Sequence, residues 1–190
     1  NPLYTPRELQ HQLTDSGAEA IVALENFAHT LEQVVGQTQV KHVILATMGD
    51  LLGGLKGTLV NLVVRKVKKM VPAYSLPGAI AFNKVLAEGA RETLGQVAIG
   101  HDDIAFLQYT GGTTGVSKGA VLLHRHVIAN VLQNEAWFAP TLGRQLAGEQ
   151  PQFACALPLY HIYALTVCAL LGLRVRRINL LIPHPRGSKG

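Results

Sequence analysis

Short apolar runs alternate with amphipathic stretches through the first fifty residues. Residues 20–24 and 40–46 are apolar runs of the length expected for buried strands, and residues 27–35 between them have helical periodicity. Residues 5–16 open with Thr-Pro-Arg-Glu, which supplies an N-cap, a proline in the first turn and a glutamate at the third position of a helix. This alternation predicts an α/β fold, a parallel sheet flanked by helices.

The alternation breaks after residue 46 and resumes near residue 80. Glycines at positions 49, 53, 54 and 57 predict a loop, and a helix with apolar and basic residues is expected over 55–71. The later pattern predicts three helices, over 82–91, 125–138 and 164–171, and four strands, over 104–109, 120–123, 153–157 and 179–182.

Composition indicates an ordered domain, or part of one. The chain has 190 residues, of which 48% are hydrophobic and 15% charged, so it can form an apolar core. Cys155 and Cys168 lie in apolar surroundings without metal-ligand spacing, and we expect buried, reduced thiols, as in a cytoplasmic protein. The longest apolar run, over 163–173, is 11 residues, well short of the roughly 20 that cross a bilayer. No signal peptide is visible.

The net charge of +5 is unevenly distributed. Residues 51–87 carry six cations and no acid: Lys56, Arg65, Lys66, Lys68, Lys69 and Lys84. Within 55–71 these cations are mixed with leucines, as in a helix that lies on an anionic membrane surface. Membrane contact and an ordinary solvated basic surface both remain open. No nucleic-acid motif accompanies the charge, so nucleic acid is not an expected partner.

Residues 109–119 combine the features of a phosphate-binding loop. They read Tyr-Thr-Gly-Gly-Thr-Thr-Gly-Val-Ser-Lys-Gly. The glycines let the backbone turn sharply and approach a ligand, and successive N–H groups of such a turn can bind an anion. Lys118 adds a positive point charge on a flexible stem. The loop contains no acid that would repel a polyphosphate.

Other glycine-rich motifs fit this loop less well. A Walker A loop needs glycine before the lysine and a hydroxyl residue after it, whereas Ser117 precedes and Gly119 follows Lys118. The segment Gly115-Val-Ser-Lys-Gly119 satisfies the nucleophile elbow of α/β-hydrolases, with Ser117 as nucleophile. An elbow needs a helix after its last glycine, but residues 120–123 predict a strand. A hydrolase therefore stays a remote alternative.

The loop resembles the signature loop of the adenylate-forming (AMP-binding) enzymes, which include acyl-CoA synthetases, luciferases and peptide-synthetase adenylation domains. Their pattern is approximately [YF]-T-[SG]-G-[TS]-T-G-x-x-K-G, and every fixed position is met over 109–119. The resemblance implies that these residues bind ATP: Tyr109, Thr110, Gly111, Gly112, Thr113, Thr114, Gly115, Ser117, Lys118 and Gly119.

A second segment supports the resemblance. Residues 156–166 contain a Pro followed by the pair Tyr160-His161, similar to the family's acyl-pocket motif, and Leu-Pro-Leu-Tyr-His-Ile points to bacterial long-chain fatty acid–CoA ligases. The similarity extends from residue 1 to about 186. It implies that the chain is an incomplete part of the large N-terminal domain, without the C-terminal lid domain.

The resemblance also implies a reaction. A fatty acid carboxylate reacts with ATP to give an acyl-adenylate, and the thiol of CoA then displaces AMP. Tyr160 would line the acyl pocket, and His161 would lie near the reacting carboxylate or α-phosphate. Mg²⁺ is expected with ATP, but no metal ligand is assigned within residues 1–190. The expected location is cytoplasmic, peripheral on the inner face of the membrane.

The family's enzymes are roughly three times as long as this chain. We therefore expect residues 1–190 to be a fragment that is inactive alone. The alternative from another class is a nucleotide-binding or scaffold fragment that has no turnover.

Overall fold

The computed structural model describes residues 2–110, 116–142 and 152–182, with the side chains of 141 and 142 excepted. The chain divides into two compact units. The first comprises residues 1–97 and 111–119, and the second comprises residues 98–110 and 120–190.

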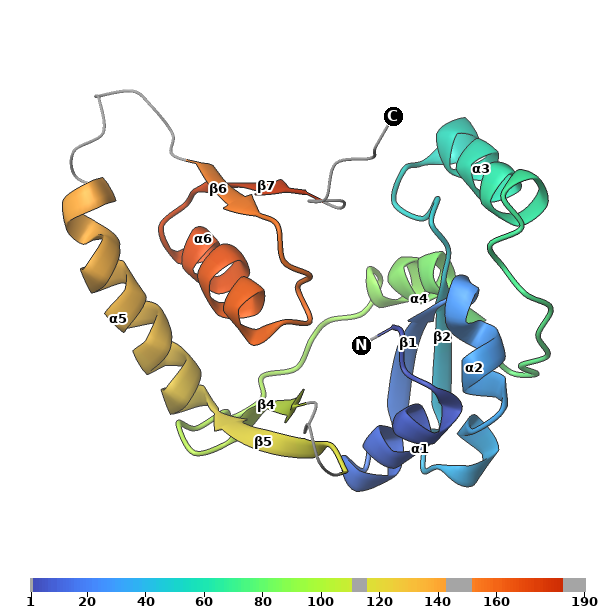
Figure 1. Ribbon diagram of the computed structural model, residues 1–190, viewed down its shortest axis with the longest axis horizontal. Helices are drawn as coiled ribbons and strands as arrows, with labels where there is room; N and C mark the ends of the chain where they lie inside the picture. Colours follow the sequence, from blue (N-terminus) through green and yellow to red (C-terminus); the bar gives the residue numbers. More distant parts are fainter. Residues whose placement is uncertain (1, 111–115, 143–151, 183–190) are drawn as a thin grey trace. The chain divides into compact units, whose positions relative to one another are not determined.

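The first unit is built on a parallel sheet, as predicted. Strands β1 (Ala20–Leu24), β2 (His42–Ala46) and β3 (Ile80–Ala81) are hydrogen-bonded in that order, and both pairs are parallel. Strands β1 and β2 lie side by side over their full lengths (Figure 1). Because both are parallel, their carboxyl ends share one edge of the sheet.

Local sequence signals define the first helices. Helix α1 (Pro6–Asp15) begins with the predicted capping box: the Thr5 hydroxyl accepts from the Glu8 amide at 3.4 Å, and Glu8 Oε2 accepts from the Thr5 amide at 2.8 Å. The backbone hydrogen bond from Thr5 lowers the pKa of Glu8. The helix expected over 27–35 is shorter, because 3₁₀ turns η1 (Glu25–Phe27) and η2 (Val35–Gln37) flank α2 (Ala28–Glu32).

The predicted glycine-rich loop included Gly57, and this part of the prediction was wrong. Helix α3 (Gly54–Leu62) already contains Gly57, and it continues as the π-helical turn η3 (Val63–Val67). A Cβ on Gly57 would lie 2.5 Å from the Gly49 carbonyl oxygen. Gly57 therefore allows close packing of the helix on the preceding turn rather than forming a loop. Residues 68–79 form no helix or strand. Helix α4 (Phe82–Gly89) follows β3 directly and ends two residues before its predicted end at residue 91.

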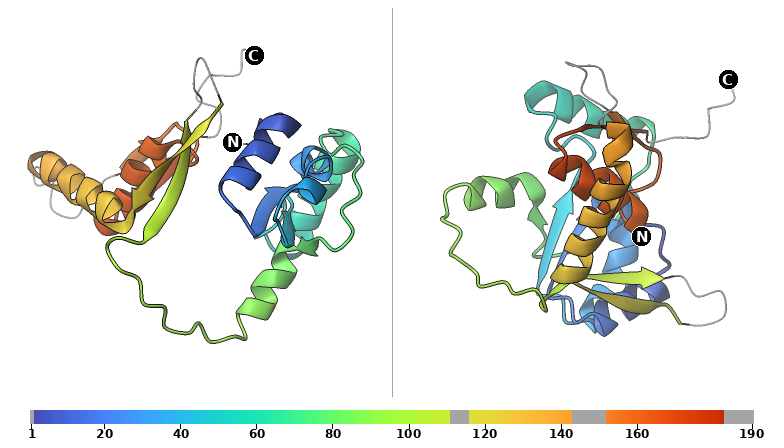
Figure 2. Two further views of the ribbon diagram at one scale, coloured as in Figure 1. Left: turned by 90° about the horizontal axis from the view of Figure 1, so that it is seen from below. Right: turned by 90° about the vertical axis from the view of Figure 1, so that its left-hand side faces the viewer.

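The second unit contains two further strand pairs. The chain leaves α4 and reaches β4 (Ile104–Thr110) without forming a helix or strand (Figure 2). Strand β4 pairs with β5 (Lys118–Leu123), and helix α5 (His124–Leu142) follows directly. The remaining elements are β6 (Gln152–Cys155), π-helical η4 (Ala164–Leu171), α6 (Gly172–Arg174) and β7 (Ile178–Leu181), and β6 pairs parallel with β7. The strand expected over 153–157 ends at Cys155.

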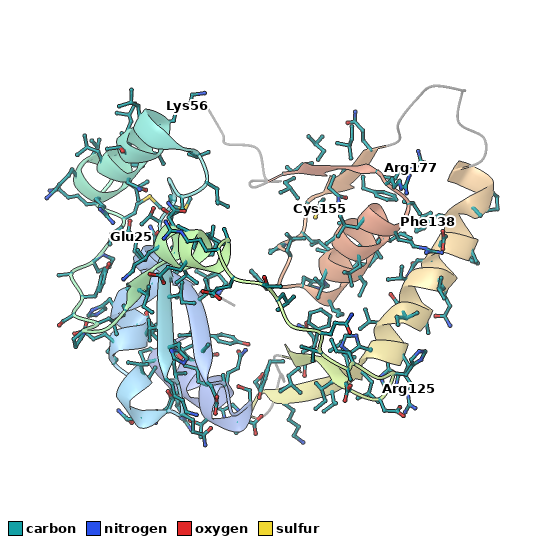
Figure 3. All side chains as sticks on the ribbon, turned by 180° about the vertical axis from the view of Figure 1, so that it is seen from behind. Glu25, Lys56, Arg125, Phe138, Cys155 and Arg177 are labelled. Carbon is teal, nitrogen blue, oxygen red and sulfur yellow. The ribbon has the colours of Figure 1, made fainter. Side chains whose placement is uncertain are left out.

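The core of the second unit lies between η4 and β6. Cys155, Ala164 and Cys168 form one buried cluster, and both thiols are free, as expected. Burial, with a hydrogen bond to Cys155, raises the pKa of Cys168 to about 11, so it is protonated at neutral pH. Phe138 of α5, labelled in Figure 3, packs on Phe153 of β6, with ring centroids 6.4 Å apart.

Candidate functional site

The candidate phosphate loop connects two strands, as predicted. Tyr109 and Thr110 end β4, and Lys118 and Gly119 begin β5. Strands β4 and β5 are hydrogen-bonded neighbours, so the loop joins two paired strands. The side chain of Lys118 is exposed, and that of Ser117 is half-buried. Gly111, Gly112, Thr113, Thr114 and Gly115 lie outside the described residues.

The backbone excludes the hydrolase alternative. A nucleophile elbow requires a helix to leave its last glycine, but Gly119 lies inside β5, which continues to Leu123. Ser117 therefore precedes a strand. The residue is not a nucleophile at the top of a strand–turn–helix.

The second motif lies between β6 and η4. His161 closes a turn, since its amide donates to the Pro158 carbonyl at 2.8 Å. Its ring caps the following helix: the amide of Tyr163 donates to Nδ1 of His161 at 3.3 Å. A nitrogen that accepts a hydrogen bond carries no proton, so the neutral ring has its proton on Nε2. His161 is exposed and presents this N–H as a donor.

A hydrogen bond joins strand β4 to the second motif. Gln108 Nε2, in β4 immediately before the loop, donates to the backbone carbonyl of Tyr160 at 3.3 Å. Both residues belong to the second unit. The strand that leads into the loop therefore contacts the segment that carries His161. Sequence reasoning missed Gln108, although its position as a polar residue in an otherwise apolar strand run was a usable signal.

A second missed residue contacts the other end of the loop. His11 Nε2, on α1, lies 2.8 Å from the carbonyl oxygen of Ser117, and both belong to the first unit. A carbonyl only accepts, so Nε2 of His11 carries the proton of this bond. No local pattern signals a contact between residues so far apart in the sequence.

An open apolar cavity of about 390 Å³ adjoins the Tyr160-His161 segment in sequence. It is lined by Cys155, Ala156, Leu157, Pro158, Leu159, Leu181 and Ile182. Such a lining suits an apolar ligand group.

The family model of the AMP-binding enzyme matches residues 1–186. The chain belongs to this family. The match includes both motifs and the strands that position them, so the predicted resemblance is confirmed.

Named members of the AMP-binding family match the chain throughout. It is 56% identical to a long-chain-fatty-acid–CoA ligase of Yersinia pestis and 54% identical to one of Escherichia coli O157:H7. Each alignment covers 100% of this chain and 33% of the relative. The chain thus spans about a third of the length of these relatives.

Two solved structures share the fold of this chain. ATP-bound MatB from Rhodopseudomonas palustris has a TM-score of 0.60 at 23% identity, covering 96% of this chain and 29% of its own. The long-chain-fatty-acid–CoA ligase FadD1 from Archaeoglobus fulgidus has a TM-score of 0.61 at 22% identity, covering 95% and 29%. These similarities confirm the predicted α/β fold.

Proposed function

We propose that the whole protein activates a long-chain fatty acid with ATP and transfers the acyl group to CoA. The observation that carries the proposal is the contact between β4, which leads into the ATP-type loop, and the His161 segment. Identity above 50% to the named ligases supports the same substrate class.

The chemistry brings one anion to another, so it depends on charge neutralisation and positioning. Lys118 and the loop hydroxyls hold the phosphates of ATP. His161 donates from Nε2 to an oxygen of the carboxylate or the α-phosphate, because its Nδ1 is already occupied by the helix cap. Tyr160, 48% exposed, lines the acyl site beside the apolar cavity. Mg²⁺ would supply further neutralisation of the phosphates, with its protein ligand outside residues 1–190.

Full-length protein incubated with palmitate, ATP and CoA tests the proposal. We expect release of AMP that requires all three substrates, and exchange of labelled pyrophosphate into ATP that requires palmitate but no CoA. A ligase makes the adenylate before CoA reacts, so the two assays separate its half-reactions. ATP binding without fatty acid-dependent exchange would instead favour a nucleotide-binding scaffold.

The protein also contacts an anionic membrane surface from the cytoplasmic side through its basic apolar surface. We define this surface as four lysines and five apolar residues, all exposed: Lys56, Lys66, Lys68, Lys69, Leu55, Leu59, Leu62, Val67 and Met70. Leu55 is 90% exposed and Val67 72%. Among the described residues, none of the four lysines pairs with a carboxylate. Lys56 points away from the strands (Figure 3).

Two structural facts refine this membrane proposal. Arg65, predicted as one of the surface cations, instead pairs with Glu25, so the lysines carry the attraction. Within the described ranges, no helix has the length and apolar character needed to cross a bilayer. The proposal is therefore contact at the interface, through apolar side chains and cations.

Replacing Lys56, Lys66, Lys68 and Lys69 with glutamine should weaken binding of the full-length protein to anionic vesicles. Each lysine near such a surface contributes about 1 kcal/mol, so we expect at least about a tenfold lower partition coefficient. Co-sedimentation with phosphatidylglycerol-containing vesicles measures it. Adenylation of dispersed fatty acid should be unchanged. The control replaces two lysines outside this surface, Lys41 and Lys84, which are exposed but paired with glutamates, and binding is compared per lysine removed. An equal loss of vesicle binding per lysine in both variants would contradict the proposal that this surface, rather than net charge alone, binds the membrane.

A further inference from the structure

A buried carboxylate holds the basic apolar surface from beneath. Glu25 is only 1% exposed and directly follows β1. Arg65 of η3 donates to it three times, from Nε at 2.9 and 3.1 Å and from Nη2 at 2.6 Å. Because the guanidinium is a rigid planar fork, these hydrogen bonds fix the orientation of the Arg65 side chain relative to Glu25 as well as its distance. The hydrogen bonds that Arg65 donates to the Glu25 carboxylate raise the pKa of Arg65.

A second set of contacts holds α3 to the turn after β2. Asn61 Oδ1 accepts from the Gly49 amide at 2.7 Å, and Asn61 Nδ2 donates to the Thr47 hydroxyl at 2.8 Å. The Thr47 hydroxyl in turn donates to Asp50 Oδ1 at 2.9 Å. Gly57 packs against the same turn at a distance that no side chain permits. These contacts fix α3 one helical turn before Arg65.

Both attachments lie at one edge of the sheet. Glu25 follows the last residue of β1 and Thr47 follows the last residue of β2, and the two strands are parallel. Gly57 and Val64 are the buried residues of the segment formed by α3 and η3. The attachments therefore decide which side of the segment faces the sheet and which side remains outward.

We propose that Glu25 and Arg65 are positioning residues that hold the basic apolar surface in the orientation that meets an anionic bilayer. The inference rests on the proposed membrane contact. Arg65 acts through the backbone of η3, which carries Lys66 and Val67 and leads to Lys68 and Lys69. The positive charge of Arg65 is paired with Glu25 rather than with a lipid headgroup.

Glu25→Gln separates positioning from simple attraction. The change makes the protein more positive by one charge and releases Arg65 from its ionic partner. If only net charge governed binding, anionic vesicles would bind the variant more tightly than wild type. If orientation governs binding, they bind it more weakly, although all four lysines are still present.

The experiment measures partition of full-length wild type, Glu25→Gln and a control into vesicles of phosphatidylcholine with 30% phosphatidylglycerol. The control is Glu19→Gln, which makes the same charge change at an exposed glutamate. Glu19 directly precedes β1 and pairs with Lys41. We expect at least about threefold weaker partition for Glu25→Gln, and partition equal to or above wild type for Glu19→Gln. Hydrogen exchange in residues 54–70 should become at least about tenfold faster in Glu25→Gln, with β1 and β2 unchanged.

The outcomes distinguish the positioning role of Glu25 and Arg65 from the membrane contact on which it rests. Binding of Glu25→Gln as tight as wild type, with wild type bound, would overturn positioning and leave membrane contact standing. Failure of wild type to bind would overturn both. Faster exchange throughout the first unit would show general loosening and would also overturn the inference. Arg65→Lys is a second variant: a single ammonium keeps the charge without the fork, so we expect intermediate partition.

Discussion

A Lys118→Ala enzyme is expected to form the acyl-adenylate at least about tenfold more slowly than wild type. Lys118 is the cation of the candidate phosphate loop, and it is exposed at the start of β5. A charge-assisted hydrogen bond contributes roughly 1.5–3 kcal/mol, and about 1.4 kcal/mol corresponds to a factor of ten in rate. The measurement is kcat/KM for ATP in palmitate-dependent pyrophosphate exchange by the full-length protein.

Two controls make the Lys118 result specific. Lys118→Arg keeps the charge and should recover part of the rate, because a phosphate accepts from either cation. Lys41→Ala removes an exposed lysine elsewhere and should leave the rate unchanged. The unfolding midpoint of Lys118→Ala should stay close to wild type, since the side chain is not buried. An unchanged kcat/KM for ATP would remove Lys118 from the phosphate site.

The features predicted correctly are those specified by neighbouring residues. The capping box of α1, strands β1 and β4 and the position of the loop between two strands depend on patterns a few residues long. The π-helical character of η4 was not predicted, although its bounds, Ala164–Leu171, were. Hydrophobic periodicity gives the length of a buried helix but does not distinguish its hydrogen-bond spacing.

The features missed depend on contacts between distant segments. The helix expected over 55–71 was recognised from its apolar residues, but the structure leaves Leu59, Leu62 and Met70 more than half exposed and buries Gly57 and Val64 instead. The sheet and the close approach of the turn at Gly49 determine which side of α3 and η3 is buried. Neither can be read from the sequence of the helix itself. In the candidate site, too, local patterns were predicted and a contact between distant segments was not. Both motifs were recognised locally, whereas Gln108 became visible only through its bond to Tyr160.

Removing Arg65 should destabilise the protein more than removing the charge of its partner, because the two ends of the ion pair differ in burial. Arg65→Gln leaves Glu25 buried with no cation to compensate it, and its side chain is only 2% exposed. We expect a loss of about 3 kcal/mol in unfolding free energy, the lower end for a broken buried pair. Glu25→Gln leaves an arginine side chain that is already 48% exposed and can turn into water. Here the expected loss is about 1 kcal/mol.

Urea unfolding of the two full-length variants measures this asymmetry in burial. The difference of about 2 kcal/mol corresponds to roughly a thirtyfold difference in the folding equilibrium constant. An exposed pair provides the reference: Glu19→Gln and Lys41→Gln should each change stability by no more than about 0.5 kcal/mol, since side chains at the surface lose little when an ion pair breaks. Equal destabilisation by Arg65→Gln and Glu25→Gln would mean that Glu25 is hydrated once its partner is gone. The carboxylate would then be too accessible to fix the direction of η3.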